Sequence, residues 1–235
     1  MPTFKHSGDL GDIIFALPAI RALGGGILYL DPNAGANEPA VKASIGKPTR
    51  LKQESIDNLR PLLLAQPYIE DVRNWLGEAV NHNLDLFRQH LRFNNLADSH
   101  LAAFNLPLTE RDKPWITVPE PIKIPNKTIV IARSLRQQGN HQFWESAVPQ
   151  IRDRCVFVGL PLEHQVFEYV FEEKIEHYPT PDLLTLARVI AGADQFIGNS
   201  SFPHTLAEAM KKELILEVNR VICTVVFNRP GAQYV

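Results

Sequence analysis

This sequence has few cysteines, a nearly balanced charge and no long apolar run. Only Cys155 and Cys223 are cysteines among the 235 residues, and both lie within apolar runs. We therefore expect small buried residues and neither a disulfide framework nor a metal site. The formal net charge of −2 speaks against nucleic acid as a partner. The sequence opens on a strand pattern without a signal peptide and has no run long enough to span a bilayer, which predicts a cytoplasmic protein and leaves only peripheral membrane contact open.

Two common site signatures are also missing. The eight histidines never fall at the spacing of zinc ligands with suitable partners. The turn Gly8-Asp9-Leu10-Gly11 lacks the third glycine of the dinucleotide-binding fingerprint. What remains is a chain with 45% apolar and 21% charged residues, enough for one large domain or two small domains with real cores.

The first half opens with a β-α-β pattern. A strand is expected over residues 3–7, an apolar helical pattern from 13 to 23 and a buried strand over 27–30. This order is typical of a parallel sheet. Pro18 lies inside the helical pattern and predicts a kink or a separate first turn. Further along we expect a long loop over 31–48, helices over 55–66 and 96–104, and a short strand over 84–87.

A proline-rich segment over residues 114–125 separates the two patterned halves and is typical of a linker. We therefore predict two domains, residues 1–118 and 126–235. In the second, strands and helices alternate, which predicts a doubly wound α/β domain. The expected strands cover 128–132, 155–159, 195–198 and 214–218, and the expected helices cover 143–151, 163–171, 183–193 and 203–211.

The most informative segment is residues 6–21, where a turn containing Gly8 and Gly11 leads from the first strand into the helical pattern and carries Asp12. Glycine lets a ligand approach the backbone closely. A helix start gathers unpaired N–H groups and partial positive charge, which favours an ionised carboxylate able to act as a general base. The alternative is that Asp9 and Asp12 simply cap the turn.

The second informative segment is residues 196–209. An apolar strand runs into Gly198, and Ser200 and Ser201 precede a helix with Pro203 in its first turn. Hydroxyls and free N–H groups at a helix start suit phosphate oxygens, and such loops follow the carboxyl ends of strands where ligands bind. The alternative is that a serine is only an N-cap and His204 only a surface residue.

Together and in this order, the two segments resemble the ADP-heptose:lipopolysaccharide heptosyltransferases, glycosyltransferase family 9. The shared patterns are Leu10-Gly11-Asp12-Ile13-Ile14 followed by Leu17-Pro18-Ala19-Ile20, and later Phe196-Ile197-Gly198-Asn199 followed by Ser201 and His204. The region from about 31 to 115 shows little of the resemblance.

The resemblance implies a GT-B-like fold, in which two Rossmann-like α/β domains face each other across a cleft, here with a reduced N-terminal domain. It implies an enzyme that transfers a sugar from a nucleotide-diphosphate sugar to a glycan or other hydroxyl-bearing acceptor. Transfer would invert the anomeric carbon and need no metal or other cofactor. Asp12 would be the catalytic base.

The resemblance also assigns the other site residues. The loop on the acceptor side would comprise Ser7, Gly8, Asp9 and Gly11. The donor would be bound by residues at the carboxyl ends of the second domain's strands, with Glu163 reaching the ribose. This donor-binding set is Arg133, Ser134, Gly159, Glu163, Gly198, Asn199, Ser200, Ser201 and His204.

Two departures from the family pattern bear on the donor. Relatives carry a Lys-Arg-Trp-like run after the linker strand, whereas this chain has His141-Gln142-Phe143-Trp144 and loses the lysine that meets the donor phosphate. Arg133, Arg136 or His141 could replace that lysine. Relatives also carry a loop aspartate that contacts the transferred sugar, where this chain has Ser200-Ser201-Phe202. Its loss argues against ADP-heptose as the donor.

Three functions therefore follow from the sequence. The leading hypothesis is an inverting glycosyltransferase. The intact Asp12 turn favours it. A nucleotide-sugar epimerase or hydrolase on the same scaffold is the second, and a non-catalytic nucleotide-sugar-binding protein is the third. The missing lysine and aspartate favour the third hypothesis.

Overall fold

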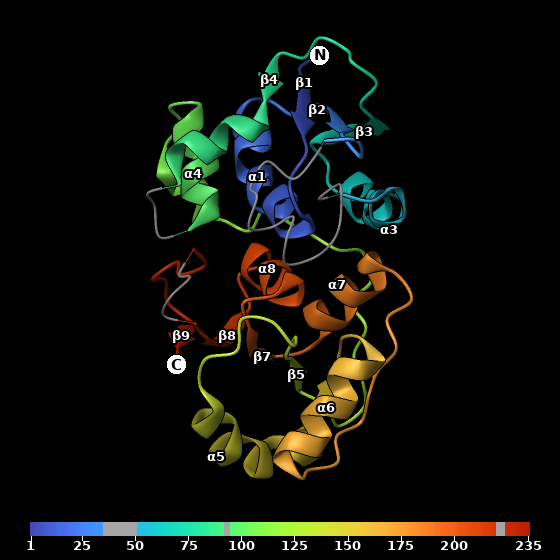
Figure 1. The fold of residues 1–235 in the computed structure, drawn as a ribbon, viewed down its shortest axis with the longest axis vertical. Helices are drawn as coiled ribbons and strands as arrows, with labels where there is room; N and C mark the ends of the chain where they lie inside the picture. Colours follow the sequence, from blue (N-terminus) through green and yellow to red (C-terminus); the bar gives the residue numbers. More distant parts are fainter. Residues whose placement is uncertain (35–50, 92–94, 220–223) are drawn as a thin grey trace. The chain divides into compact units, whose positions relative to one another are not determined.

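The structure, a computed structural model, describes residues 1–34, 51–91, 95–219 and 224–235. Most of the loop predicted over 31–48, and Cys223, lie outside these residues. The chain divides into two compact units, Met1–Arg111 and Asp112–Val235. Each unit contains a parallel sheet with helices (Figure 1), so the predicted α/β class is confirmed.

The first unit contains a four-stranded sheet in the order β3-β2-β1-β4, and all its paired strands are parallel. Strands β1 and β2 pair from Thr3 beside Ile27 to His6 beside Leu30, so their carboxyl ends meet at one edge. The strands are β1 (Thr3–His6), β2 (Gly26–Leu30), β3 (Ile69–Asn74) and β4 (His82–Asn83).

The helices of this unit are α1 (Leu10–Ala22), α3 (Gln53–Leu64) and α4 (Leu96–Ala103), with 3-10 helices η1 (Leu84–His90) and η2 (Leu108–Arg111). Helix α1 packs against α4, and α3 packs against β3. Residues 13–20 of α1 are all buried, as expected for an apolar helix enclosed by neighbours. Pro18 lies inside α1, which is one helix with no separate first turn.

One local prediction in this unit is wrong, and one strand was not predicted. Residues 84–87 were expected to form a strand, but they begin η1. The side chain of Asn83 accepts the N–H of Asp85 at 3.1 Å, which closes a turn and ends the extended backbone. Strand β3 was not predicted, because its buried residues Ile69 and Val72 are three apart with two acidic residues between them, so the sequence shows no apolar-polar alternation.

The second unit contains a five-stranded parallel sheet in the order β6-β5-β7-β8-β9. All four residues of the inner strand β5 are buried, as expected where helices cover both faces of a sheet. The strands are β5 (Ile129–Ala132), β6 (Cys155–Phe157), β7 (Gln195–Asn199), β8 (Glu213–Glu217) and β9 (Ala232–Tyr234).

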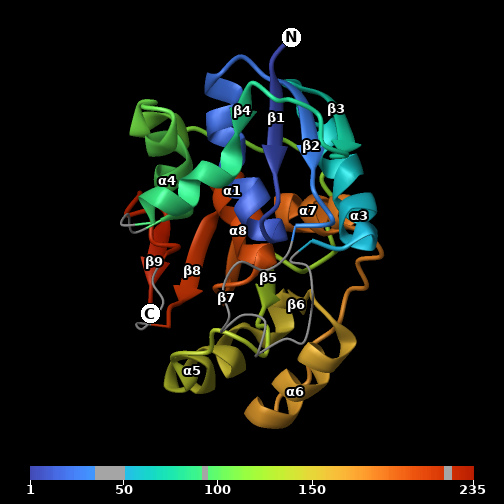
Figure 2. The ribbon, with the colours of Figure 1, turned by 45° about the horizontal axis from the view of Figure 1, so that its top comes forward.

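The helices of the second unit are α5 (His141–Ile151), α6 (Pro161–Phe171), α7 (Leu183–Gly192) and α8 (Phe202–Ala209), and η3 (Arg152–Arg154) follows α5. Figures 1 and 2 show α5 and α6 on one face of the sheet and α7 and α8 on the other. On the α5 and α6 face, Trp144 and Phe167 pack with Phe157 of the sheet. The doubly wound prediction for this half is confirmed.

The proline-rich segment over 114–125 lies in the second unit. The N–H of Trp115 donates to the carbonyl of Ala209 at 2.9 Å, and the N–H of Ile122 donates to that of Arg188 at 2.9 Å. These bonds tie the segment to the end of α8 and to the middle of α7. The unit boundary therefore precedes the segment, at Arg111.

Candidate functional site

The strand orders identify one ligand-binding position in each unit. In the first, β1 lies between β2 and β4; in the second, β5 lies between β6 and β7. In each sheet, the strands that come later in the chain are added first on one side of this central strand and then on its other side. The point where the strand order reverses is called the topological switch point, and ligands in open α/β sheets bind there, beside the carboxyl ends of the strands. The Gly8–Asp12 turn follows β1. The loop from Arg133 follows β5, and Ser200 follows β7.

The turn after β1 requires glycine at position 8. A Cβ atom built on Gly8 would lie 2.6 Å from Oδ2 of Asp12 and 2.6 Å from Cε1 of His6, closer than non-bonded atoms approach. The Asp12 carboxylate therefore rests directly against the Gly8 backbone. This contact explains the glycine that the sequence pattern singled out.

Asp12 also has a capping role. Asp9 is the exposed N-cap of α1, and Oδ2 of Asp12 accepts the Asp9 N–H at 3.2 Å, as in a capping box. Gly11 lies beside Asp12 in the first turn, and both are half-buried. The capping alternative from the sequence is thus present, and it fixes one carboxylate oxygen near the positive end of the helix.

Two buried histidines support this turn. The N–H of Gly8 donates to Nδ1 of His6 at 2.8 Å, so Nε2 carries the His6 proton. That nitrogen lies 3.1 Å from Nε2 of His100, whose Nδ1 lies 2.8 Å from the Leu96 carbonyl. All three contacts can form together when both imidazole rings are neutral, because His6 then donates to His100 and His100 donates to Leu96. Burial lowers the pKa of His6 to about 4 and that of His100 well below its usual value.

Asp85 holds the other side of the turn and was not found by sequence reasoning. Its carboxylate accepts the N–H of Ser7 at 3.0 Å and the Ser7 hydroxyl at 2.8 Å. It also pairs with Lys5 at 2.8 Å and Arg88 at 2.7 Å. Although burial opposes ionisation, the bonds from Lys5, Arg88 and Ser7 hold the Asp85 pKa well below its ordinary range. Ser7 is thus a buried anchor of the turn.

In the second unit, Arg133 is engaged by another buried residue. Its Nε and Nη2 donate to the two carboxylate oxygens of Glu217 at 2.8 and 3.0 Å, and its side chain is 5% exposed. Glu217 also accepts the indole N–H of Trp144 and the N–H groups of Gly139 and Asn140. Arg133 was expected to contact the donor. This geometry makes it a positioning residue for the loop after β5, because its guanidinium is already paired and buried.

Asn199 ties together the two loops at the switch point. Its Oδ1 accepts the N–H of Ser134 at 3.0 Å, and its Nδ2 donates to the carbonyls of Ser134 and Arg136. Asn199 is fully buried, and its side-chain amide bonds to these backbone groups. The absence of a side chain at the preceding Gly198 lets β5 approach closely, because a Cβ atom there would lie 2.6 Å from the Ala132 carbonyl oxygen. Both residues therefore shape the site rather than present a side chain to it.

Ser200 and Ser201 sit where β7 meets α8. Ser201 is the N-cap of α8 with extended backbone, and its N–H donates to the Asn199 carbonyl at 2.7 Å. Both serines are half-buried. Pro203 in the first turn removes one donor, while the other early N–H groups of the helix have no partner within it. Ser201 thus occupies the N-cap position, but its side chain makes no capping hydrogen bond, and its hydroxyl donates to the Asn199 carbonyl at 3.3 Å. The helix start still presents donors to an anion.

His204 is buried near the start of α8. It is 1% exposed, and in the described part of the chain neither ring nitrogen has a hydrogen-bond partner. Burial, with a smaller effect of Arg229, lowers its pKa to about 3. A buried ring with two unsatisfied nitrogens is costly, so His204 is the residue of this segment that most needs a ligand or water. The alternative of a surface histidine is wrong.

Gly159 and Glu163 follow β6 at the edge of the same sheet. The Glu163 carboxylate accepts the N–H of Leu160 at 2.9 Å and thereby caps α6, whose first residue is Pro161. The Gly159 carbonyl lies 3.0 Å from Nε2 of His177. One Glu163 oxygen is thus used locally, and its half-buried side chain remains a candidate for the ribose hydroxyls.

Among the three cations that could replace the family's lysine, the structure favours Arg136. Arg133 is paired with Glu217, and His141 lies 3.3 Å from the carboxylate of Glu145. Arg136 is exposed in the loop after β5, and within the described residues no partner holds its guanidinium. Its carbonyl accepts the Ser134 hydroxyl at 3.0 Å, which fixes the loop backbone beneath the side chain.

Within the described residues, no group of three or more His, Cys, Asp or Glu side chains is placed to hold a metal ion. No helix in this part of the chain combines the length and apolarity needed to cross a membrane.

Solved structures of glycosyltransferases share this fold. The glycosyl transferase family 9 protein from Veillonella parvula DSM 2008 matches with a TM-score of 0.59 and 10% identity, over 99% of this chain and 84% of its own. E. coli heptosyltransferase WaaC with ADP matches with a TM-score of 0.59 and 11% identity, over 99% and 92%. No protein-family model and no curated protein matches the sequence.

The iron-containing, dodecameric heptosyltransferase TibC, solved with ADP-D-β-D-heptose and known from enterotoxigenic E. coli H10407, matches with a TM-score of 0.63 and 14% identity. This chain is covered over 98%, but it spans only 61% of TibC. At these identities the similarities establish the fold: this chain has the α/β architecture of family 9 glycosyltransferases, as the sequence motifs predicted.

Proposed function

We propose that this protein is a glycosyltransferase that moves a sugar from a nucleotide-diphosphate sugar to a hydroxyl of an acceptor. One observation carries the proposal. The loops after β5 and β7, tied by Asn199, meet the start of α8, where the buried His204 has no partner for either ring nitrogen within the described chain. A site with unsatisfied donors at a helix start and a switch point suits a diphosphate.

In this proposal the second unit holds the donor. Early N–H groups of α8 and the Ser200 and Ser201 hydroxyls bind diphosphate oxygens, and Arg136 supplies the positive charge. Glu163 is the candidate for the ribose hydroxyls. Arg133, Ser134, Gly159, Gly198 and Asn199 keep these groups in place through the backbone.

The first unit supplies the base. The acceptor oxygen attacks the anomeric carbon as the bond from that carbon to the diphosphate oxygen breaks, and the acceptor proton passes to the Asp12 carboxylate. A single displacement inverts the anomeric centre. The Gly8 turn, braced by His6 and Asp85, fixes the carboxylate before substrate arrives. We propose that charge on the leaving diphosphate is stabilised by Arg136 and helix donors, without a metal.

A second function, binding of a nucleotide sugar without transfer, is favoured by one observation. The buried pairing of Arg133 with Glu217 removes one cation from the site, and the family's lysine is also missing. Of the three candidate cations, Arg136 is then left to neutralise the leaving group, together with the uncharged donors at the helix start. If this is too little for catalysis, the protein binds the nucleotide sugar and does not turn it over.

The test is a thermal-shift panel of ADP, GDP, UDP and CDP with inorganic phosphate as control. A ligand at a hundred times its Kd stabilises the folded protein by about 2.7 kcal/mol, so the preferred base appears as the largest shift. The matching nucleotide sugars are then incubated with candidate acceptors, with and without EDTA, and the products analysed. Transfer that survives EDTA supports the proposal. Failure of every nucleoside diphosphate to stabilise the protein would overturn both functions, and binding without turnover would select the second.

A further inference from the structure

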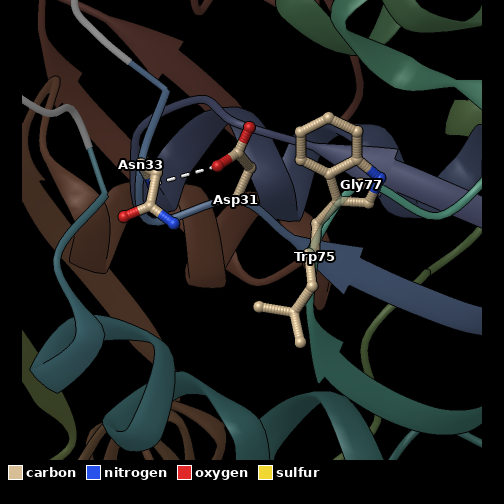
Figure 3. A pocket seen from close by; sticks show the side chains of 5 residues that line it. Asp31, Asn33, Trp75 and Gly77 are labelled. Atoms are coloured by element: carbon tan, nitrogen blue, oxygen red, sulfur yellow. Dashed lines mark hydrogen bonds between the residues drawn. The ribbon is translucent and has the colours of Figure 1, made fainter.

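A pocket lies at the carboxyl edge of the first unit's sheet (Figure 3). It has a volume of about 330 Å³ and is lined by Asp31, Asn33, Trp75, Leu76 and Gly77. Asp31 directly follows β2 and Trp75 directly follows β3. No residue of this pocket is among the site residues predicted from the sequence, because Asp31 and Trp75 are far apart in the chain.

The pocket shares its sheet edge with the Asp12 turn. The N–H of Asp31 donates to the carbonyl of His6, the last residue of β1, at 3.0 Å. The N–H of Trp75 donates to the carbonyl of Leu30 at 2.8 Å. Neighbouring strands lie about 4.8 Å apart, so the pocket begins one strand away from the turn that carries Asp12.

Trp75 forms a rigid aromatic wall. Its indole N–H donates to the Glu78 carbonyl at 2.9 Å, and the N–H of Leu76 donates to the Glu78 carboxylate at 2.7 Å. The ammonium of Lys5 lies 4.9 Å from the ring centre. The bond to Glu78 and the contact with Lys5 hold the ring in place, so the part of Trp75 that lines the pocket is an apolar surface that needs no reorganisation.

Asp31 and Asn33 supply the polar wall. Oδ1 of Asp31 accepts the N–H groups of Asn33 and Ala34 at 2.9 and 3.1 Å, and Oδ2 lies 3.4 Å from Lys5. These contacts fix the carboxylate and use both lone pairs of Oδ1, which leaves one lone pair of Oδ2 for a ligand. The side-chain amide of Asn33 is exposed and has no partner among the described residues. This amide can donate one hydrogen bond through its NH₂ group and accept another through its oxygen.

We propose that this pocket binds one pyranose ring of the acceptor, stacked on Trp75 with its hydroxyls bonded to Asp31 and Asn33. The inference rests on the proposed function and names its acceptor class. An aromatic ring beside a carboxylate and an amide matches the chemistry of a sugar ring, which has apolar C–H faces and hydroxyl groups at its edges. The volume is at the low end for small-molecule pockets, which suits one ring.

The charges argue against a nucleotide in the same pocket. Lys5 is the cation beside it, and its ammonium is already engaged with Asp85 at 2.8 Å and Asp31 at 3.4 Å. A phosphate would meet the Asp31 carboxylate, and none of the described residues that line the pocket carries a positive charge to offset it. A neutral sugar meets no such penalty.

Tryptophan fluorescence tests the inference on the whole protein. Trp115 and Trp144 are 1% and 0% exposed, so quenching by acrylamide reports mainly on Trp75. The probes are methyl β-D-glucopyranoside, methyl β-D-galactopyranoside, methyl α-D-mannopyranoside and N-acetylglucosamine. We expect at least one to reduce the quenching constant of Trp75 about twofold at saturation. Asn33→Ala should weaken that glycoside about fivefold, as loss of one hydrogen bond predicts.

Two further variants make the outcome specific. Trp75→Ala should remove the fluorescence response and, by calorimetry, most of the glycoside binding, while Leu160→Ala, an exposed apolar residue of the second unit, should change neither. If no glycoside protects Trp75 in the unmodified protein, or if Asn33→Ala and Trp75→Ala both bind it normally, the inference is wrong. ADP is tested alongside. Protection of Trp75 by ADP would also overturn it, whereas failure of all nucleoside diphosphates to bind anywhere would overturn the proposed function instead.

Discussion

The Nε2 atoms of His6 and His100 lie 3.1 Å apart, and both rings are fully buried beneath the Gly8 turn. The bond works only if His6 donates and His100 accepts, because Gly8 donates to the other nitrogen of His6. A proton added to either ring would set two N–H groups against each other. The turn that presents Asp12 therefore depends on two neutral histidines.

We expect the stability of the folded protein to fall on mild acidification. The folded-state pKa of His6 is about 4 and that of His204 about 3, both below the ordinary value of 6.5, so the unfolded chain takes up these protons first. Their contribution is complete above about pH 6.5 and is lost as pH falls toward 4, by about 1.4 kcal/mol per pH unit for each histidine. Urea denaturation at pH 7, 6 and 5 measures this slope. The His204→Leu variant should have a slope that is smaller by about 1.4 kcal/mol per pH unit, the contribution of one histidine. An unfolding free energy that does not change with pH would contradict the expectation.

Replacement of Asp12 by asparagine should abolish transfer while leaving the donor bound. The asparagine amide would keep an oxygen to accept the Asp9 N–H, so the helix start survives, but it cannot take the acceptor's proton. We expect kcat to fall by about 10²- to 10⁴-fold with the nucleoside diphosphate Kd unchanged. Asp57→Asn, on the exposed side of α3, is the matched control. Equal loss of binding and turnover would count against a catalytic role.

Arg136→Ala should weaken nucleoside diphosphate binding about 10- to 100-fold, the effect of losing one charge-assisted contact. Arg154→Ala is the control, since Arg154 is also exposed but lies before β6, at the opposite end of the sheet. Isothermal titration with the preferred diphosphate measures both. The assignment fails if the Arg136→Ala variant binds the diphosphate as tightly as the Arg154→Ala control. It also fails if the Kd of the Arg136→Ala variant depends on salt concentration as strongly as that of the native protein.

Glu217→Gln should destabilise the second unit by about 3–5 kcal/mol, because it removes one charge of a buried ion pair. Glu217 accepts from Arg133, Trp144 and two backbone N–H groups, and although burial raises its pKa, the bonds from Arg133, Gly139 and Trp144 hold it low. Glu213→Gln on the same strand is exposed and should change little. Urea denaturation compares the two. A Glu217 variant within about 1 kcal/mol of the native protein would show that the pair is dispensable.

Most elements of the fold follow from local pattern. Strands with continuous apolar residues, such as 129–132, and capped helices, such as the one that Asp182 begins by accepting the Thr185 N–H at 2.7 Å, are predictable from the sequence. Strands β3 and β9 are not. Strand β3 has no apolar-polar alternation and β9 has three residues, so each is defined by its pairing with a neighbouring strand.

The site shows the same division. The sequence by itself determined the Gly8–Asp12 turn and the serine-rich start of α8, since glycine, caps and apolar strands act over a few residues. Which polar groups meet was decided by tertiary structure alone. Glu217 lies 84 positions from Arg133, and His100 lies 94 from His6. Hydrogen bonds need atoms within about 3 Å, and only the folded chain brings such distant residues that close.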